Sequence, residues 1–373
     1  MKSYNHLWEE FFTKENYILG LYNATKHKGG KKRRNKRAKQ YRKNADRIYD
    51  KMMEYITNFE SDKHTIVEIN DGISKKKRNI IVPTMREQIV HHMVINILKP
   101  IFLKSMYEHA YGSVPSRGAH DAKKFIVRDI KKSKKDMKYC LKMDIKKFFD
   151  SIPRKILKEK LKKIIHDEKF LNILFKIIDI DDKENGIPIG FYTSQWFANF
   201  YLTKLDHFIK ENLKVKIYYR YMDDIAIFGS NKKELHKIKD EIKKYLNDEL
   251  GLKLKENWQI FLFHYVKKSN KEIGRDLGFM GFRFFRNKTI LRKCILFKMT
   301  RKAKRVGKKP IKTIYDCRQM LSYLGWIDCT NTYNIYKKRI KPFICFQHLK
   351  RRTSIYQKRV NIEEKKRNEI CGM

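Results

Sequence analysis

The sequence predicts an α+β fold in which a small sheet carries acidic residues at its strand ends and basic helices occupy both ends of the chain. Apolar, β-branched and aromatic residues fill 214–229 on both sides of the pair Asp223-Asp224, which is the pattern of a β-hairpin. A second apolar strand, at 139–144, ends in Asp144. Residues 1–62 and the chain after Arg283 instead have the composition of basic helices.

The remaining elements follow from hydrophobic periodicity and turn residues. At the N-terminus we expect helices over about 7–22 and 38–59, around a basic loop. The other expected elements are a hairpin at 63–85 that turns at Asn70-Asp71-Gly72, a helix at 86–102, a Gly/Pro/Ser loop at 111–120 and an amphipathic helix at 153–166. Hydrophobic residues make up 42% of the 373 residues, which is enough for the cores of two or three domains.

The charge of the chain predicts a polyanionic partner. Lys and Arg total 87 against 41 Asp and Glu, a formal net charge of +46. Such an excess favours nucleic acid, because phosphate contacts dominate affinity for it; a solvated or disordered basic face is the alternative. The densest basic run is 27–43, and a second lies at 302–312. The candidate RNA-binding residues of the first run are Lys31, Lys32, Arg33, Arg34 and Arg37.

Cysteine spacing and the lengths of the apolar runs limit the class of protein. The six cysteines show no C-x-x-C spacing, so the sequence indicates neither a zinc site nor a disulfide framework. We find neither a signal-peptide pattern nor an apolar run of 18 residues. The expectation is therefore a cytoplasmic protein with no membrane partner.

Asp144, Asp223 and Asp224 are the candidate catalytic residues. Asp is common in turns, so each could merely cap or decorate a solvated turn. Two adjacent carboxylates at a buried strand end are costly unless cations neutralise them, however, and a third carboxylate ends another strand. If the two strand ends meet, they could hold two divalent cations about 3.5–4 Å apart. Carboxylate ligands suit Mg²⁺, with Mn²⁺ possible, rather than zinc.

Four motifs, in this order along the chain, resemble those of reverse transcriptases. They are Asp144-Ile145-Lys146-Lys147-Phe148-Phe149, the run IPIGFYTSQ at 187–195, Tyr221-Met222-Asp223-Asp224, and Leu277-Gly278-Phe279-Met280-Gly281-Phe282. The resemblance covers about 65–285 and implies a right-hand polymerase with fingers, a ferredoxin-like palm and a helical thumb. The domains so implied are a basic N-terminal helical extension at 1–62, fingers at 63–139, a palm at 140–285 with a fingers insertion at about 155–186, and a basic helical thumb at 286–373.

The resemblance also implies roles for individual residues. Asp144, Asp223 and Asp224 would be the catalytic carboxylates and, with the Ile145 carbonyl, the metal ligands. Phe149 would be an aromatic gate that leaves no room for a ribose 2′-hydroxyl and so favours deoxynucleotides; plain core packing is the alternative. The residues implied at the incoming nucleotide are Lys76, Arg78, Phe149, Ile189, Gly190, Ser194 and Gln195, and those of the primer grip are Met280 and Gly281.

Two departures from the usual motifs bear on the chemistry and on the subgroup. Trp258 lies where related polymerases often carry a lysine that acts as general acid for pyrophosphate. Lys255 is the nearest substitute, but in so basic a chain we predict that Lys255 is an ordinary surface lysine. Ile189 replaces a Gln that is common before the motif's glycine, which resembles the diversity-generating retroelement enzymes. In that family the apolar residue is linked to low fidelity at template adenines, although Phe191-Tyr192 departs from its usual Asn-Leu.

The function implied is that of an RNA-directed DNA polymerase that adds deoxynucleotides by two-metal catalysis, on a specific cognate RNA in a diversity-generating retroelement. One alternative is an antiphage defence enzyme, of abortive-infection or unknown-group type, that copies a noncoding RNA or makes untemplated DNA. Another is a non-catalytic RNA-binding scaffold, against which the intact set of Asp residues speaks. Retron and group II intron enzymes are expected to be less similar, because the chain has neither an Asn-Ala-x-x-His nor a Val-Thr-Gly segment and no large maturase domain. The partners implied are template RNA, nascent DNA, a structured noncoding RNA, dNTPs and a small basic accessory protein.

Overall fold

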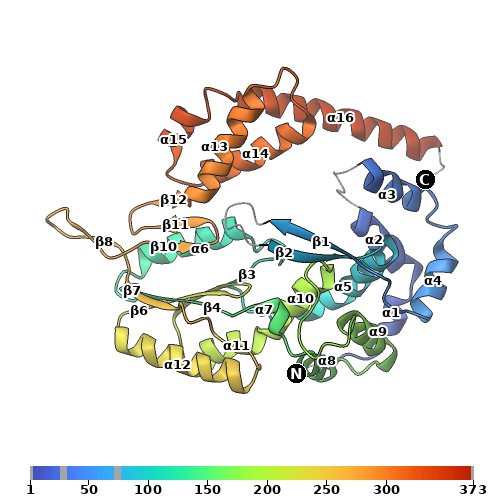
Figure 1. The fold of residues 1–373 in the computed structure, drawn as a ribbon, viewed down its shortest axis with the longest axis horizontal. Helices are drawn as coiled ribbons and strands as arrows, with labels where there is room; N and C mark the ends of the chain where they lie inside the picture. The colour runs from blue at the N-terminus through green and yellow to red at the C-terminus, as the bar shows by residue number, and fades with distance from the viewer. Residues whose placement is uncertain (1–2, 26–31, 71–76, 371–373) are drawn as a thin grey trace. The chain divides into compact units, whose positions relative to one another are not determined.

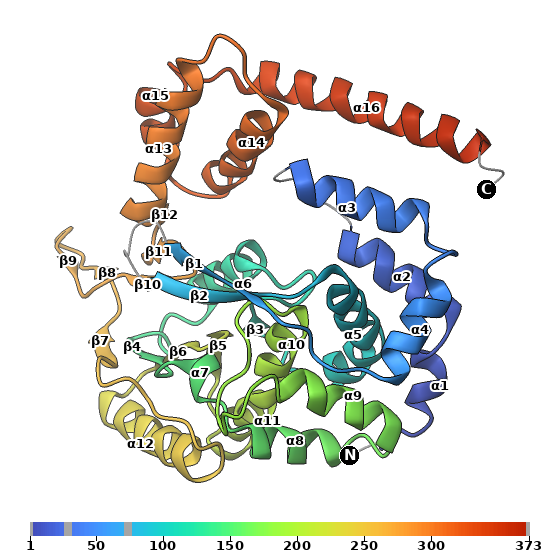
Figure 2. The ribbon, with the colours of Figure 1, turned by 45° about the vertical axis from the view of Figure 1, so that its right-hand side comes forward.

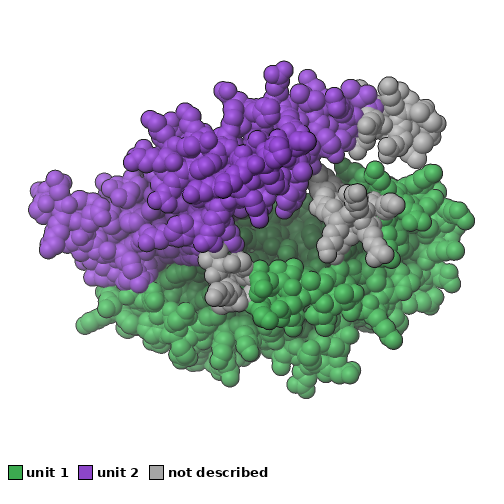
Figure 3. All heavy atoms as spheres, turned by 45° about the horizontal axis from the view of Figure 1, so that its top comes forward, with its two compact units in different colours: residues 1–118, 141–260 green, residues 119–140, 261–373 purple. Residues whose placement is uncertain are grey.

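The computed structural model of the protein describes residues 3–25, 32–70 and 77–370, without the side chains of 32–36 and 363–370. The chain forms two compact units, which Figure 3 distinguishes by colour. The first comprises residues 1–118 and 141–260, and the second comprises 119–140 and 261–373. The chain enters the second unit at residue 119, leaves it after 140 and returns at 261, upstream of the thumb boundary expected at 286. The predicted domain limits remain predictions.

The largest sheet of the described residues has five strands. Its strands are β3 (Ala110–Tyr111), β4 (Tyr139–Asp144), β5 (Ile217–Tyr221), β6 (Asp224–Gly229) and β7 (Gln259–Leu262). The spatial order is β3-β5-β6-β4-β7, with β5 and β6 antiparallel and β3 parallel to β5. Helices separate β4 from β5 and β6 from β7, so the last four strands have the split βαβ connectivity and the order of a ferredoxin-like sheet. The predicted α+β fold with a ferredoxin-like palm is confirmed.

Helices cover this sheet and position the loops around it. Helix α12 (Lys232–Asp248) packs on β6, and Figure 1 shows it along one face of the sheet. It begins where the Asn231 side chain accepts a hydrogen bond from the Lys233 N–H at 2.9 Å. The other helices of this part are α5 (Met85–Ser105), α7 (Phe148–Ser151), α8 (Arg154–Lys162), α9 (Glu168–Ile178), α10 (Tyr192–Tyr201), α11 (Thr203–His207) and the π-helix η1 (Phe208–Asn212).

The N-terminal region folds as four helices rather than the two expected. They are α1 (Leu7–Phe11), α2 (Lys14–Thr25), α3 (Lys32–Lys43) and α4 (Tyr49–Thr57), and Figure 2 shows them gathered beside α5. The predicted continuous helix over 38–59 is wrong because Asn44 and Asp46 compete with the helical backbone. Asp46 instead pairs with Lys14 at 2.9 Å, and the Ala45 carbonyl accepts a hydrogen bond from the Tyr17 hydroxyl at 3.0 Å.

The predicted hairpin at 63–85 is present as β1 (Thr65–Asn70) and β2 (Lys77–Val82), paired antiparallel. Asp71 and Gly72 of its predicted turn lie outside the described residues. After β2, a reciprocal capping box between Thr84 and Glu87 starts α5, which explains why the strand stops there.

The second unit combines short strands with basic helices, as expected for the chain after Arg283. Its three-stranded sheet consists of β10 (Leu277–Phe279), β11 (Phe282–Phe284) and β12 (Thr289–Leu291), and β8 (Tyr265–Val266) pairs with β9 (Glu272–Ile273). Its helices are α6 (Ala119–Lys132), α13 (Lys293–Gly307), α14 (Ile314–Asp328), α15 (Tyr333–Arg339) and α16 (Phe346–Ile370). Among the described residues of the whole chain, no helix is long and apolar enough to cross a bilayer.

Candidate active site

The loop between β5 and β6 is a tight turn that presents two carboxylates at one edge of the sheet. Tyr221 and Asp224 are paired across it, so only Met222 and Asp223 form the loop. Met222 has a φ of 54°, a left-handed conformation that costs a non-glycine residue about 1–3 kcal/mol. The surrounding structure must therefore hold this turn in place, as is common at functional sites.

The end of β4 lies directly against this turn. The Ile145 N–H donates a hydrogen bond to the Asp223 carbonyl at 3.2 Å, so Asp144 and Asp223 belong to touching backbone segments. The chain after α12 completes the arrangement, because the Lys255 N–H donates to the Asp144 carbonyl at 2.9 Å. The predicted meeting of two acidic strand ends is thus observed.

The electrostatics of this site work against full ionisation of its carboxylates. Burial, reinforced by the charge of Asp144, raises the pKa of Asp223 to about 6. Two lysines partly balance the other carboxylates: Lys142 on β4 lies 3.0 Å from Asp224, and the Lys255 ammonium contacts Asp144. Among the described residues, no three acidic, His or Cys side chains are gathered in a group that could hold a metal ion, and Asp144 and Asp224 are paired with lysines instead. Carboxylate oxygens are nevertheless the donor type that Mg²⁺ and Mn²⁺ prefer.

Lys255 is not the stray surface lysine that the sequence predicted. Its side chain is about one-third exposed and pairs with Asp144, one of the three candidate catalytic aspartates. Trp258, in contrast, packs on α12: its ring lies 5.8 Å from that of His236 and 4.6 Å from the Lys239 ammonium. Lys255, three residues before Trp258, is thus the lysine that contacts Asp144.

A buried polar network supports the strained turn, and sequence reasoning missed it. Arg220 and Asp206 are both fully buried and joined by two hydrogen bonds, of 2.7 and 2.6 Å. Arg220 also donates to the Met222 carbonyl and to the Asn199 side chain, each at 3.1 Å. Asn199 in turn donates to the Gly112 carbonyl at 2.9 Å, and Tyr218 donates to Asp206 at 2.6 Å. A sequence signal existed, because Arg220 is a charged residue in an otherwise apolar strand.

Backbone contacts bring several of the predicted nucleotide-binding residues together. The Ile81 N–H on β2 donates to the Ile189 carbonyl at 2.8 Å. Gly190, with a φ of 122°, packs so closely that a Cβ there would lie 2.2 Å from the Ile81 carbonyl oxygen. The loop that carries Ile189 is also fastened to α7, since the Ile187 N–H donates to the Phe149 carbonyl at 2.9 Å. The strand of Arg78, the loop of Ile189 and Gly190, and the helix of Phe149 thus form one connected structure.

The other predicted residues are placed as follows. Phe148 is buried, as expected of a core residue, whereas Phe149 is half-buried. On α10, Ser194 is buried and Gln195 is exposed, and their contacts with a nucleotide remain predictions. In the second unit, Met280 and Gly281 form the two-residue turn of the β10–β11 hairpin, both with positive φ.

Part of the predicted RNA-binding set cannot be placed. Lys31 and Lys76 lie outside the described residues. Lys32, Arg33 and Arg34 lie at the start of α3, and of these three residues only the backbone is described. Arg37, on the same helix, has an exposed side chain.

Comparison with known proteins assigns the family. A family model described as "Reverse transcriptase (RNA-dependent DNA polymerase)" matches residues 61–279. The chain is similar to the group II intron-encoded protein LtrA of Lactococcus lactis, with 30% identity over 151 residues, 38% of this chain and 24% of LtrA. It is also similar to the retron Ec73 reverse transcriptase of Escherichia coli, with 28% identity over 206 residues, 51% of this chain and 61% of that protein. Among solved structures, the telomerase of Candida albicans matches with a TM-score of 0.46 and 12% identity, over 82% of this chain and 62% of that chain.

The chain spans only 17% to 61% of the length of the curated relatives it matches. Intron-encoded and retron proteins, which the motif pattern placed further away, are among those relatives, and the more specific subgroup remains a prediction. The family match confirms the predicted right-hand polymerase class. It covers more than half of the chain and includes all three aspartates of the site, so the protein belongs to the reverse transcriptase family of RNA-dependent DNA polymerases.

Proposed function

We propose that the protein synthesises DNA on an RNA template at Asp144, Asp223 and Asp224. One observation carries the proposal: the 3.2 Å hydrogen bond from Ile145 to the Asp223 carbonyl, which joins the two acidic strand ends into one site. Clustering carboxylates in a half-buried site is destabilising, as the raised pKa of Asp223 indicates. A scaffold that only bound RNA would have no use for that arrangement.

Mg²⁺, or Mn²⁺, fits this site because its donors are carboxylate and carbonyl oxygens. Asp144, Asp223, Asp224 and the Ile145 carbonyl would hold two ions, which supply activation of a primer 3′-hydroxyl and charge stabilisation for the departing pyrophosphate. The chain itself would position the incoming dNTP. Arg78 would bind the triphosphate, and Gly190 would let the backbone approach closely.

Phe149 is proposed to exclude ribonucleotides. Its backbone carbonyl is fixed by Ile187, and its half-buried ring follows Asp144 by five residues. We expect Phe149→Ala to raise the use of a ribonucleotide relative to its deoxynucleotide by about tenfold or more, because it opens space beside C2′. Single-nucleotide incorporation, measured as kcat/KM for each substrate, provides the ratio. Phe149→Tyr keeps the ring and should keep the discrimination; a ratio that stayed unchanged in Phe149→Ala would exclude the gate.

Lys255 is proposed to provide the positive charge and the proton that the departing pyrophosphate requires. It would replace the lysine that related polymerases often carry at the position of Trp258. We expect Lys255→Met to slow nucleotide addition by about 100-fold, the effect typical of removing a positioned general acid. Lys253→Met is the matched control, since Lys253 is exposed and only its backbone carbonyl takes part in the site, accepting from Lys146 at 2.8 Å. Single-turnover rates that were equal in the two variants would remove Lys255 from the chemistry.

The biological role proposed is synthesis on a cognate RNA in a diversity-generating retroelement. Ile189 supports it, because an isoleucine side chain cannot hydrogen-bond a base edge or sugar and so checks pairing less strictly. Copying of a noncoding RNA in antiphage defence is the runner-up, since it requires the same site. A template/variable repeat pair near the gene would favour the first role, and a structured RNA gene beside it the second.

A further inference from the structure

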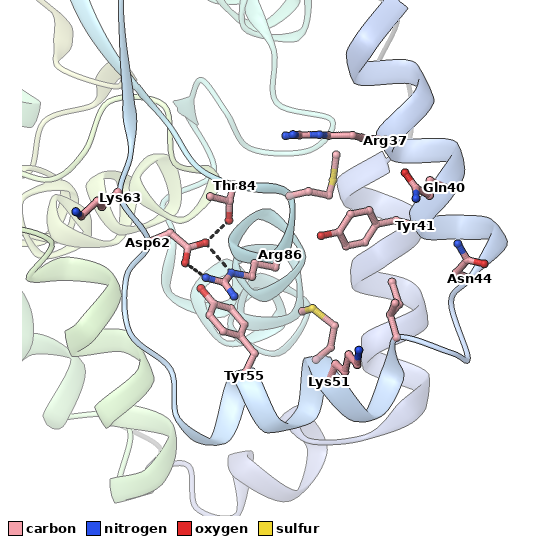
Figure 4. Close-up of a pocket in the computed structure, with 13 residues that line it drawn as sticks. Arg37, Gln40, Tyr41, Asn44, Lys51, Tyr55, Asp62, Lys63, Thr84 and Arg86 are labelled. Atoms are coloured by element: carbon pink, nitrogen blue, oxygen red, sulfur yellow. Dashed lines mark hydrogen bonds and ion pairs between the residues drawn. The ribbon is translucent and has the colours of Figure 1, made fainter.

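A groove separate from the carboxylate site lies between the N-terminal helices and the start of α5. It has a volume of about 780 Å³, and Figure 4 shows the side chains that line it. Helix α3 contributes Arg37, Gln40 and Tyr41, and α4 contributes Lys51 and Tyr55. Asn44, which directly follows α3, also lines the groove. Its volume is that of a site for a nucleotide-sized ligand.

The groove continues along the base of the β1–β2 hairpin. A second cavity, of about 320 Å³, shares Arg37, Lys63, Thr84 and Met85 with the first. It extends past Thr65 and Val67 of β1 and Val82 of β2. The shared residues join the two cavities into one track, longer than a single nucleotide needs. An extended strand fits such a track better than an isolated small molecule does.

The charge of the groove is positive because its one carboxylate is already paired. Asp62 accepts hydrogen bonds from Thr84 at 2.5 Å and from Arg86 at 2.8 Å. Although burial opposes it, these bonds hold the pKa of Asp62 below its usual value. Arg37, Lys51 and Lys63 are all exposed along the groove and add three positive charges. Phosphate groups complement such a rim.

The walls of the groove suit a flat base. The Arg86 guanidinium lies 4.2 Å above the centre of the Tyr55 ring, so a planar stack is already present on one side. Tyr41 is half-buried on the other wall, and in Figure 4 its hydroxyl points toward the Asp62–Arg86 pair. Met52, Met85 and Ile48 add apolar surface, while Gln40 and Asn44 offer amide groups. Aromatic rings with amides and a cationic rim are what recognise unpaired nucleotides.

From this geometry we infer that the groove binds an unpaired segment of RNA, with one base held between Tyr41 and the Tyr55–Arg86 stack and the flanking phosphates along Arg37 and Lys63. The inference rests on the proposed function, in which RNA is the substrate. The groove would be a second RNA site, separate from the carboxylate site and specific for single-stranded RNA. A duplex has its bases stacked and paired and cannot insert one of them without melting.

The test is equilibrium binding of a fluorescent 12-nucleotide single-stranded RNA to the full chain, in EDTA and without dNTPs. We expect Tyr41→Ala to weaken binding about tenfold and Tyr41→Phe to leave it within twofold, because stacking needs the ring and not the hydroxyl. Arg37→Ala should weaken binding and lower the salt dependence of the affinity by about one phosphate contact. Lys39 is an exposed neighbour on α3 outside the groove, so Lys39→Ala should have a smaller effect on both the affinity and its salt dependence. Affinity for a fully paired RNA should change less than twofold in Tyr41→Ala.

Three outcomes would overturn the inference. One is equal weakening by Arg37→Ala and Lys39→Ala together with no effect of Tyr41→Ala, which indicates a basic surface without a base site. Another is saturable binding of free AMP that displaces the RNA, which indicates a small-molecule site. The third is the absence of photo-crosslinks to residues 37–63 from RNAs carrying 4-thiouridine at successive positions, a measurement on the unmodified protein. Because no synthesis is involved, failure here would leave the proposed polymerase activity standing, and loss of that activity would leave this binding measurable.

Discussion

Replacing Asp223 and Asp224 together by Ala is expected to lower deoxynucleotide addition by about 10³-fold or more, while RNA binding stays within about twofold of the wild type. The two carboxylates are proposed metal ligands, and the thioether of Met222, the other residue of the β5–β6 loop, cannot replace them. The variant should still fold, because burial and the charge of Asp144 already make a charged Asp223 unfavourable.

Primer extension on RNA and a filter-binding assay on the same preparation would measure both quantities. Asp248→Ala is a suitable control, since Asp248 is an exposed carboxylate in the last turn of α12. Synthesis that continued at the wild-type rate in the double variant would place the chemistry elsewhere. Loss of RNA binding along with synthesis would mean that the change had disturbed the fold.

The largest effect on stability is expected at Asp206. Asp206→Ala would leave the Arg220 guanidinium buried without its carboxylate, which typically costs about 3–5 kcal/mol of unfolding free energy. Chemical denaturation of the full chain, followed by tryptophan fluorescence, measures the loss. Asp240→Ala provides the matched control: the Asp240 side chain is 63% exposed, so water can replace its contact with Lys239 and the loss should be at most about 1 kcal/mol.

A double replacement separates stability from function. In Asp206→Leu/Arg220→Met no charge is left unpaired, so part of the stability should return. Activity should remain low, because the Met222 carbonyl and the Asn199 side chain have lost their donor and the strained turn is no longer held. Full activity in the stable double variant would show that the network serves packing alone.

The sequence could predict the site because its key residues lie at strand ends that local pattern reveals. The apolar runs around Asp223 predicted the hairpin, and Asp144 at the end of another strand predicted the second half of the site. The resemblance to reverse transcriptases implied a ferredoxin-like palm, which the observed strand order confirms. These features depend on residues close together in the chain.

The features that sequence reasoning missed depend on contacts between distant residues. Asp206 lies 14 residues before Arg220, and Lys255 lies 111 residues after Asp144. In a chain with 87 basic residues, composition cannot single out the lysine that contacts Asp144. The break between α3 and α4 was missed for a related reason, because Ala45 and Asp46 bond to Tyr17 and Lys14, which lie far earlier in the chain.

The most direct test of the central claim is the sequence of the DNA that the wild-type protein makes. The reaction contains a defined RNA template of mixed sequence, an annealed DNA primer, Mg²⁺ and the four dNTPs. The account predicts primer-extended DNA that is complementary to the RNA, and none of it when EDTA replaces Mg²⁺. Extension whose sequence did not follow the template, or no extension under any divalent cation, would contradict RNA-templated DNA synthesis at this site.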